Sequence, residues 1–211
     1  MSIVYIGIGS NLGDRQKNID KTMEKLTARK GIELKKISSV IETDPVGDTT
    51  QPKFLNACCM IDTTLYPNDL LEVLHSVERE LGRSRDSSKK VSAEDRLKML
   101  EEGNFNIDAQ AKAIVSAGEK KEERPQKKGP RHIDLDILFY DDIIMKGNNL
   151  IVPHPLLHER LFVLEPLAEI APEIMHPALK KSVKELLAQL KQSSVESLKP
   201  QVENQTTDES N

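Results

Sequence analysis

The alternation of apolar and polar positions predicts four β-strands and two α-helices in the first 140 residues. Runs rich in Ile and Val that end in turn residues are typical of strands. Runs in which apolar residues recur every three or four positions are typical of helices. The predicted strands span 2–9, 32–43, 53–63 and 132–140, and the predicted helices span about 15–29 and Pro67 to Gly82. Their β-α-β-β-α-β order predicts an α+β fold of the ferredoxin-like kind, an antiparallel sheet with flanking helices.

Local signals refine the element boundaries. Asp14 is placed to cap the first helix and Gly31 to end it. The glycines after the first strand do not have GxGxxG spacing, so Gly7 and Gly9 are interpreted as a tight turn from strand to helix. Periodicity predicts two further helices, near 155–170 and 181–191.

A charged segment interrupts this plan between the second helix and the fourth strand. Residues 86–128 carry 10 Lys or Arg against 9 Asp or Glu in 43 positions, with few large apolar residues. Such a composition favours a charged insertion without a core of its own. We therefore expect a single domain over 1–192 that contains this insertion, followed by a polar, disordered tail over 193–211.

Composition narrows the classes of function. The net charge of −4 provides no overall basic field that would attract nucleic acid. No apolar run approaches the roughly 18 residues of a membrane span, and the N-terminus lacks the features of a signal peptide. Cys58 and Cys59 are adjacent, a spacing that disfavours a disulfide between them. We expect a cytoplasmic protein that binds neither nucleic acid nor membrane.

The fourth predicted strand contains two carboxylates. Side chains alternate along a strand, so Asp134 and Asp136 share one face while Leu135 projects to the other. Two like charges a few ångströms apart are costly unless something positive lies between them. Mg²⁺ supplies such a charge with one or two carboxylates, and it keeps its other positions for water and phosphate oxygens. Two ordinary aspartates at a solvent-facing strand edge are the alternative.

Basic residues near this strand favour the metal interpretation. They are Arg83, Arg85, Arg131, His154 and Arg160. Guanidinium groups bind phosphate oxygens in a bidentate manner, so arginines beside acidic metal ligands indicate a phosphate-rich substrate. Each arginine taken singly is better interpreted as a solvated surface charge, and it is their concentration around one predicted strand end that favours a phosphate site.

Five motifs occur in a characteristic order along the chain. They are YIGIGSNLGDR, ETDPVG followed by FLNAC, ELGRSR, GPRHIDLDIL and VPHPLLHERLF. Over residues 2–190, apart from the insertion, the chain resembles the 6-hydroxymethyl-7,8-dihydropterin pyrophosphokinase family. The resemblance implies the ferredoxin-like fold and transfer of the β,γ-pyrophosphoryl unit of ATP to the pterin hydroxymethyl group, with release of AMP, in folate biosynthesis.

The resemblance also implies three groups of site residues. The group assigned to catalysis comprises Arg83, Arg131, Asp134 and Asp136, and the two aspartates would hold two Mg²⁺ ions. The group assigned to ATP comprises Glu78, Arg85, Ile137, His154 and Arg160. The group assigned to the pterin comprises Thr43, Pro45, Val46, Phe54, Asn56 and Phe162. The two phenylalanines would sandwich the ring, and the asparagine would bind its polar edge.

Some of these residues also have a plainer interpretation. Taken without the family pattern, Phe54 and Phe162 are better interpreted as core-packing residues than as ring-binding residues. Asn56 is a more independent signal, because an amide inside an apolar strand needs hydrogen-bond partners. His75 and His158 are interpreted as surface or helix-packing histidines.

The insertion is the main departure from the family pattern. The family closes this gap with a short mobile loop over the active site, whereas here 43 residues separate Arg85 from Gly129. We expect the insertion to act as a lid, and whether Lys127 or Lys128 reaches a phosphate stays open. Asn149 and Pro155 also depart from residues common in the family, so nucleotide affinity is expected to differ.

Two other functions were weighed against the same sequence features. A phosphohydrolase or nucleotidyltransferase with the same aspartates would release ADP or phosphate, or would need no pterin. A ferredoxin-like module for single-stranded RNA would need exposed strand aromatics and a basic face, which the sequence does not display. We expect a monomer with ATP and the pterin as its partners, and contacts with other folate-pathway enzymes through the insertion.

Overall fold

The computed structural model describes residues 1–47, 49–82, 130–147 and 149–196. The predicted insertion over 86–128 lies outside these residues, as do Arg83, Arg85, Lys127 and Lys128. The expected tail lies outside them from residue 197 onward. No helix in the described part of the chain combines the length and apolar character that a membrane crossing requires.

The main sheet confirms the predicted fold class. The elements in chain order are β1 (Ser2–Ser10), α1 (Arg15–Thr27), β2 (Ile32–Ile37), β3 (Ile41–Thr43), β4 (Phe54–Thr63), α2 (Pro67–Glu80) and β5 (Asp134–Tyr140). The strands pair in the order β2-β4-β1-β5, β3 pairs with β4, and every pairing is antiparallel. With β2 and β3 taken as one predicted strand, this is the β-α-β-β-α-β arrangement.

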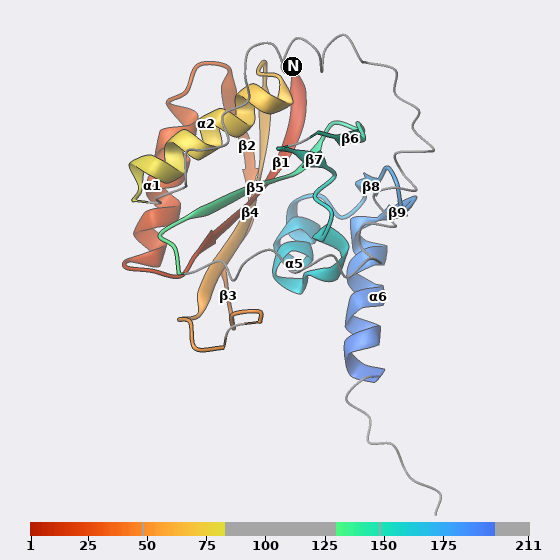
Figure 1. The fold of residues 1–211 in the computed structure, drawn as a ribbon. Helices are drawn as coiled ribbons and strands as arrows, with labels where there is room; N and C mark the ends of the chain where they lie inside the picture. Colours follow the sequence, from red (N-terminus) through yellow and green to blue (C-terminus); the bar gives the residue numbers. More distant parts are fainter. Residues whose placement is uncertain (48, 83–129, 148, 197–211) are drawn as a thin grey trace, which may run out of the picture.

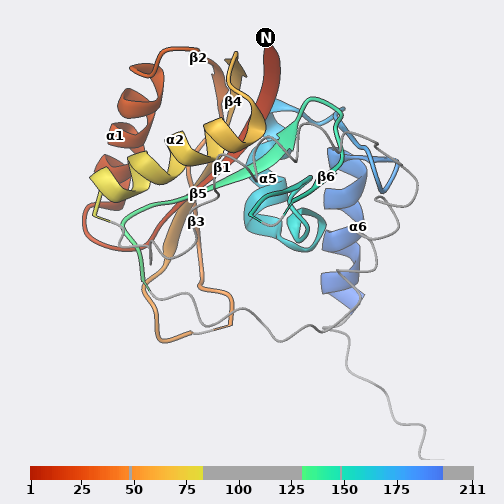
Figure 2. The same cartoon turned by 45° about the horizontal axis from the view of Figure 1, so that its top comes forward.

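Two helical layers cover opposite faces of the sheet (Figures 1 and 2). One core lies between the sheet and the pair α1 and α2, and it contains Val4, Ile6 and Ile8 of β1. The other core, which contains Tyr5, involves η1 (Leu157–Glu159), α5 (Leu161–Ile170) and α6 (Val183–Glu196). The period-two alternation of a strand therefore directs neighbouring residues of β1 into two separate buried cores.

Several boundaries differ from the sequence prediction. The strand expected over 32–43 is divided into β2 and β3. Between them, the Ser38 backbone N–H donates to the Cys58 carbonyl, and the Ser38 hydroxyl accepts from the Cys58 backbone N–H, both at 2.9 Å. The helix expected over 155–170 begins only at Leu161, after η1. The helix α6 continues to Glu196, so residues 193–196 are helical instead of disordered.

Two short hairpins were not predicted. They are β6 (Met145–Lys146) with β7 (Ile151–Val152), and β8 (Met175–His176) with β9 (Lys181–Ser182). The first follows β5 directly, and a hydrogen bond from the His154 backbone N–H to the carbonyl of Leu138 (3.0 Å) holds the chain after β7 against β5. This segment therefore lies beside β5, the edge strand of the main sheet.

The turns around α1 and α2 are partly as predicted. Asp14 caps α1, since its carboxylate accepts from the Lys17 backbone N–H at 3.1 Å. Gly31 and Gly82 have positive φ values of 83° and 93°, which suits their positions after the two helices. The interpretation of Gly7 and Gly9 as a turn is wrong, because both lie within β1.

Candidate active site

Gly9 lies at the centre of a row of residues that crosses three strands. In the pairing register, Gly9 is opposite Asn56 of β4 on one side and Asp134 of β5 on the other. Directly opposed residues share one face of a sheet, so the amide and the carboxylate flank a position that has no side chain. A Cβ added at Gly9 would lie 3.3 Å from Asn56 Oδ1, 3.9 Å from Phe54 Cδ1 and 4.0 Å from Asp134 Cβ.

The two aspartates occupy the first and third positions of β5. Leu135 between them is buried in the core under α1 and α2, while both aspartates are partly exposed. Arg131 Nη1 lies 2.9 Å from Asp134 Oδ2, and the two side chains are only 15% and 13% exposed. In this shielded position the ion pair is screened less by salt than an open surface pair.

Arg160 belongs to the same electrostatic environment. Burial lowers the pKa of Arg160, while the carboxylates of Asp136 and Asp134 act in the opposite direction. Arginine still keeps its charge in proteins, so a second guanidinium acts on the aspartates from the residue just before α5. Its Cζ lies 5.7 Å from the ring centroid of Phe162.

Phe54 and Asn56 stand on the β4 side of the row. Asn56 is 5% exposed, and its Nδ2 donates to the hydroxyl of Thr43 on β3 at 2.7 Å. The guanidinium carbon of Arg131 lies 5.6 Å from the ring centroid of Phe54. Arg131 therefore contacts both the carboxylate side and the aromatic side of the row.

The loop after β3 contains Pro45 and Val46. The side chain of Val46 is 81% exposed, and Pro45 is partly exposed. Thr43 joins this loop to Asn56 by the hydrogen bond described above. A role for these residues in pterin binding stays a prediction.

A pocket of about 310 Å³ lies beside the edge strand β5, between α2 and the hairpin β6–β7. It brings together Asp136, Ile137 and His154, which were all predicted as site residues. His154 Nδ1 accepts from the Leu156 backbone N–H at 3.2 Å, which fixes the orientation of the ring. Asp136 thus lines this pocket and also lies on the sheet face that carries Asp134.

Other residues that line this pocket were not predicted as site residues, among them His75 and Asn149. His75, which is partly buried on α2, lines it, and its interpretation as a surface or helix-packing histidine stays a prediction. The available signal was spacing: His75 is four residues after Leu71, another lining residue, and positions i and i+4 share a helix face. Asn149 also lines the pocket.

Glu78 is fully buried and not in open contact with the pocket. Its Oε1 accepts from the Leu135 backbone N–H at 2.8 Å. Leu135 stands between the two aspartates, so this hydrogen bond fixes the strand that carries them. The predicted contact of Glu78 with ATP stays a prediction.

The two aspartates suit a magnesium site in type and position. Mg²⁺ is commonly bound by one or two carboxylates together with waters and substrate phosphates. Among the described residues, no group of three or more His, Cys, Asp or Glu side chains is placed to hold a metal ion.

Comparison with known proteins places this geometry in a family. The sequence profile of the family described as 7,8-dihydro-6-hydroxymethylpterin-pyrophosphokinase (HPPK) matches residues 5–97 and 103–172. The chain belongs to the HPPK family. It transfers pyrophosphate from ATP to 6-hydroxymethyl-7,8-dihydropterin in folate biosynthesis.

Curated relatives named 2-amino-4-hydroxy-6-hydroxymethyldihydropteridine pyrophosphokinase support the assignment. The Methylorubrum extorquens protein is 35% identical, over 93% of this chain and 98% of its own length. The Aquifex aeolicus protein is 36% identical, over 88% of this chain and 90% of its own. The folic acid synthesis protein fol1 of Pneumocystis carinii is 37% identical over 85% of this chain, which spans only 19% of that longer protein.

Solved structures support the HPPK fold. The crystal structure of an HPPK-DHPS in complex with substrates superposes with a TM-score of 0.60 at 13% identity, over 92% of this chain and 44% of that one. A Plasmodium falciparum HPPK-DHPS with SDX-DHP gives a TM-score of 0.57 at 14% identity, over the same shares of the two chains. At this identity the likeness concerns the fold alone.

Proposed function

We propose that the pyrophosphokinase reaction takes place on the sheet face centred on Gly9. The observation that carries the proposal is the row Asn56–Gly9–Asp134, in which an amide and a carboxylate flank an empty glycine position. A flat, polar-edged ring could approach the backbone there, with its hydroxymethyl group directed toward Asp134. The two substrates would then meet above β1.

On the pterin side, Phe54 and Phe162 would stack against the two faces of the ring, and Asn56 would bind its polar edge. The buried amide of Asn56 is already oriented by its bond to Thr43. A preset hydrogen-bonding group loses little entropy when the ligand binds. Thr43, Pro45 and Val46 would add contacts from the loop after β3.

On the phosphate side, Asp134 and Asp136 would hold two Mg²⁺ ions. When bound, these ions supply charge neutralisation for the ATP phosphates and the acceptor oxygen. Arg131 and Arg160 would hold phosphate oxygens, because both guanidinium groups lie near the aspartates and keep their charge. His154 and Ile137 would contact the nucleotide from the pocket beside β5.

Catalysis would then rest on positioning and charge compensation. In-line transfer needs the acceptor hydroxyl and the β-phosphorus to be held at attack distance, and such positioning alone can supply several kcal/mol. The proton of the hydroxymethyl group would leave near Asp134. No covalent enzyme intermediate is required. Arg83 and Arg85, which the resemblance adds to this set, lie outside the described residues.

Metal stoichiometry tests the proposal. Mn²⁺ binding would be followed by electron paramagnetic resonance in the presence of a non-hydrolysable ATP analogue and the pterin. We expect two Mn²⁺ per chain, and fewer in Asp134→Asn and in Asp136→Asn. One Mn²⁺ in the unaltered protein would refute the two-ion arrangement. Unchanged Mn²⁺ binding in both variants would refute the assignment of the aspartates.

We further propose that residues 1–192 act as one domain, as a monomer in the cytoplasm, without nucleic-acid or membrane partners. Light scattering during gel filtration would test the monomer, and a dimer mass would contradict it. Contacts with other folate-pathway enzymes through the insertion remain a proposal as well.

A further inference from the structure

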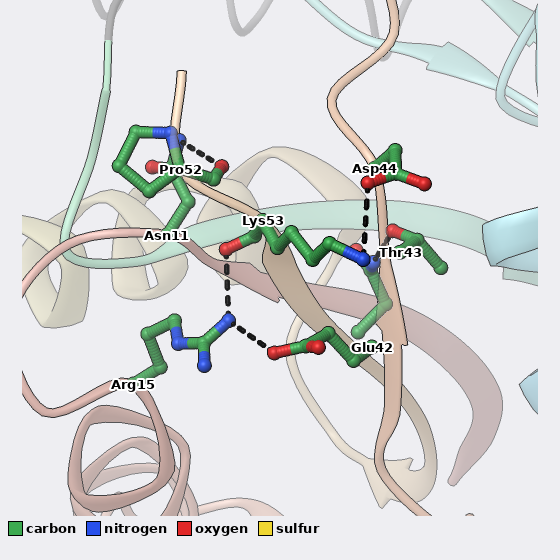
Figure 3. A network of polar contacts seen from close by, with 8 residues as sticks. Asn11, Arg15, Glu42, Thr43, Asp44, Pro52 and Lys53 are labelled. Atoms are coloured by element: carbon green, nitrogen blue, oxygen red, sulfur yellow. Dashed lines mark hydrogen bonds and ion pairs between the residues drawn. The ribbon is translucent and has the colours of Figure 1, made fainter. Parts of the chain in front are cut away.

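Asn11, the first residue after β1, connects three segments of the chain through one buried side chain. The residue is 2% exposed. Its Oδ1 accepts from the Arg131 backbone N–H at 2.7 Å, and its own backbone N–H donates to the Arg131 carbonyl at 3.1 Å. Its Nδ2 donates to Gln51 Oε1 at 3.2 Å. The same Nδ2 donates to the Pro52 carbonyl at 3.4 Å (Figure 3).

The first connection reaches the phosphate side of the active site. Because Asn11 bonds to both the N–H and the carbonyl of Arg131, it fixes the backbone from which the guanidinium departs. That guanidinium pairs with Asp134 at 2.9 Å and lies over the ring of Phe54. A shift of the Arg131 backbone would therefore displace the group that compensates the carboxylate.

The second connection reaches the pterin side. Pro52 stands two residues before Phe54, where the loop after β3 joins β4. The next residue, Lys53, is held by Arg15, whose Nη1 donates to the Lys53 carbonyl at 3.0 Å (Figure 3). Asn11 and Arg15 thus hold consecutive carbonyl groups of the segment that leads into the aromatic residue.

We propose that Asn11 is a positioning residue for pyrophosphoryl transfer, which holds Arg131 and the segment before Phe54 in a fixed relation. This deepens the proposed function, because it rests on the roles assigned above to Arg131 and Phe54. Asn11 touches neither substrate in this arrangement. It acts on the turnover number through Arg131 and on pterin affinity through Pro52.

A double-mutant cycle separates this role from simple stabilisation. The variants are Asn11→Ala, Arg131→Ala and the double variant, with kcat and the KM for the pterin measured for each. Loss of an outer residue that orients a catalytic group typically lowers activity about 10- to 100-fold, and we expect a kcat loss of that order for Asn11→Ala. In the Arg131→Ala background the same change should lower kcat little further, because interacting sites are non-additive.

A second variant, Asn11→Asp, separates the effect of the hydrogen bond from Arg131 from the effect of the hydrogen bond to Pro52. In Asn11→Asp the carboxylate can still accept from the Arg131 N–H, but it cannot donate to the Pro52 carbonyl. We expect a raised KM for the pterin with a kcat closer to that of the unaltered protein. This variant also carries the test if Asn11→Ala does not fold, since an unchanged KM in Asn11→Asp would overturn the connection through Pro52.

Thr63→Val is the matched control. Thr63 is also fully buried, and its hydroxyl donates to the Gly31 carbonyl at 2.7 Å and accepts from the Leu65 N–H at 3.1 Å. It lies at the opposite end of β4 from Phe54. We expect Thr63→Val to lower the melting temperature while leaving kcat and the pterin KM unchanged.

The outcomes distinguish two kinds of failure. Additive kcat losses in the cycle, or an unchanged kcat in a folded Asn11→Ala protein, would overturn the proposal for Asn11 and leave the proposed function standing. An unchanged kcat in Arg131→Ala would refute the role of Arg131 itself, and the positioning role of Asn11 would fail with it. A kcat loss in Asn11→Ala that disappears in the Arg131→Ala background supports the proposal.

Discussion

Substitution of Gly9 by alanine should weaken pterin binding while leaving the stability of the fold nearly unchanged. In Gly9→Ala the new Cβ would lie 3.3 Å from Asn56 Oδ1, a few tenths of an ångström closer than an ordinary contact. Asn56 cannot retreat without cost, because its Nδ2 is bonded to the Thr43 hydroxyl at 2.7 Å. The methyl group would therefore cover the amide oxygen that the pterin is proposed to use.

The effects on stability and on binding are expected to differ. Replacing a strand glycine by alanine gains about 0.5–1 kcal/mol, while straining one hydrogen bond loses about 0.5–1.5 kcal/mol. The free energy of unfolding should therefore change little. Leaving the amide oxygen without its ligand partner costs about 1–3 kcal/mol in binding, which corresponds to a rise of roughly 5- to 150-fold in the KM for the pterin.

Steady-state kinetics with varied pterin, together with urea denaturation, would measure both quantities. Gly7→Ala is the matched control, because its Cβ would meet the flexible side chain of Leu138 at 3.3 Å and lies one row away from Asn56. A Gly9→Ala protein with an unchanged pterin KM would refute the placement of the ring above β1. Equal KM increases in both variants would show that the row at Gly9 has no special role.

Two other predictions concern Glu78 and His176. Glu78→Ala removes the acceptor for the Leu135 N–H, so it should destabilise the protein by about 1–3 kcal/mol and lower turnover. Glu78→Gln keeps an acceptor oxygen and should restore most of the stability and most of the turnover. A stable but inactive Glu78→Gln protein would show that the reaction uses the charge of Glu78. Burial and the nearby His158 lower the pKa of His176 from 6.5 to about 4, so on acidification the unfolded chain takes up a proton before the folded one. Stability should be full above pH 6.5 and fall by about 3 kcal/mol between pH 6.5 and 4, as measured by urea denaturation, and an equal fall in His176→Asn would contradict the assignment to this residue.

The sequence predicted the long elements because their signals are local and repeated. The apolar stripe of α2 and the alternation of β1 each extend over several residues, so both elements can be recognised without knowledge of their tertiary contacts. The hairpin β6–β7 has two residues in each strand, which is too short for any period to be seen. The break between β2 and β3 depends on the contact of Ser38 with Cys58, which lies 20 positions away.

Candidate site residues could be proposed from the sequence only where the residue type itself indicates a chemistry. Asp134 and Asp136 were recognisable, because two carboxylates on one strand face need compensation. Gly9 was misinterpreted, because glycine is typical of turns and its use here depends on what stands opposite it in two other strands. Asn11 carries no signal in the sequence alone, since only the folded chain brings Arg131 against it.

The most direct test of the central claim resolves AMP from ADP in mixtures of the protein, ATP and Mg²⁺, with and without 6-hydroxymethyl-7,8-dihydropterin. The account predicts AMP and pterin diphosphate in equal amounts, and only when the pterin is present. Asp134→Asn and Asp136→Asn should each lower AMP formation by orders of magnitude, while Asp142→Asn, an exposed aspartate just after β5, should not. ADP as the product, AMP without pterin, or full activity in both Asp134→Asn and Asp136→Asn would contradict the account.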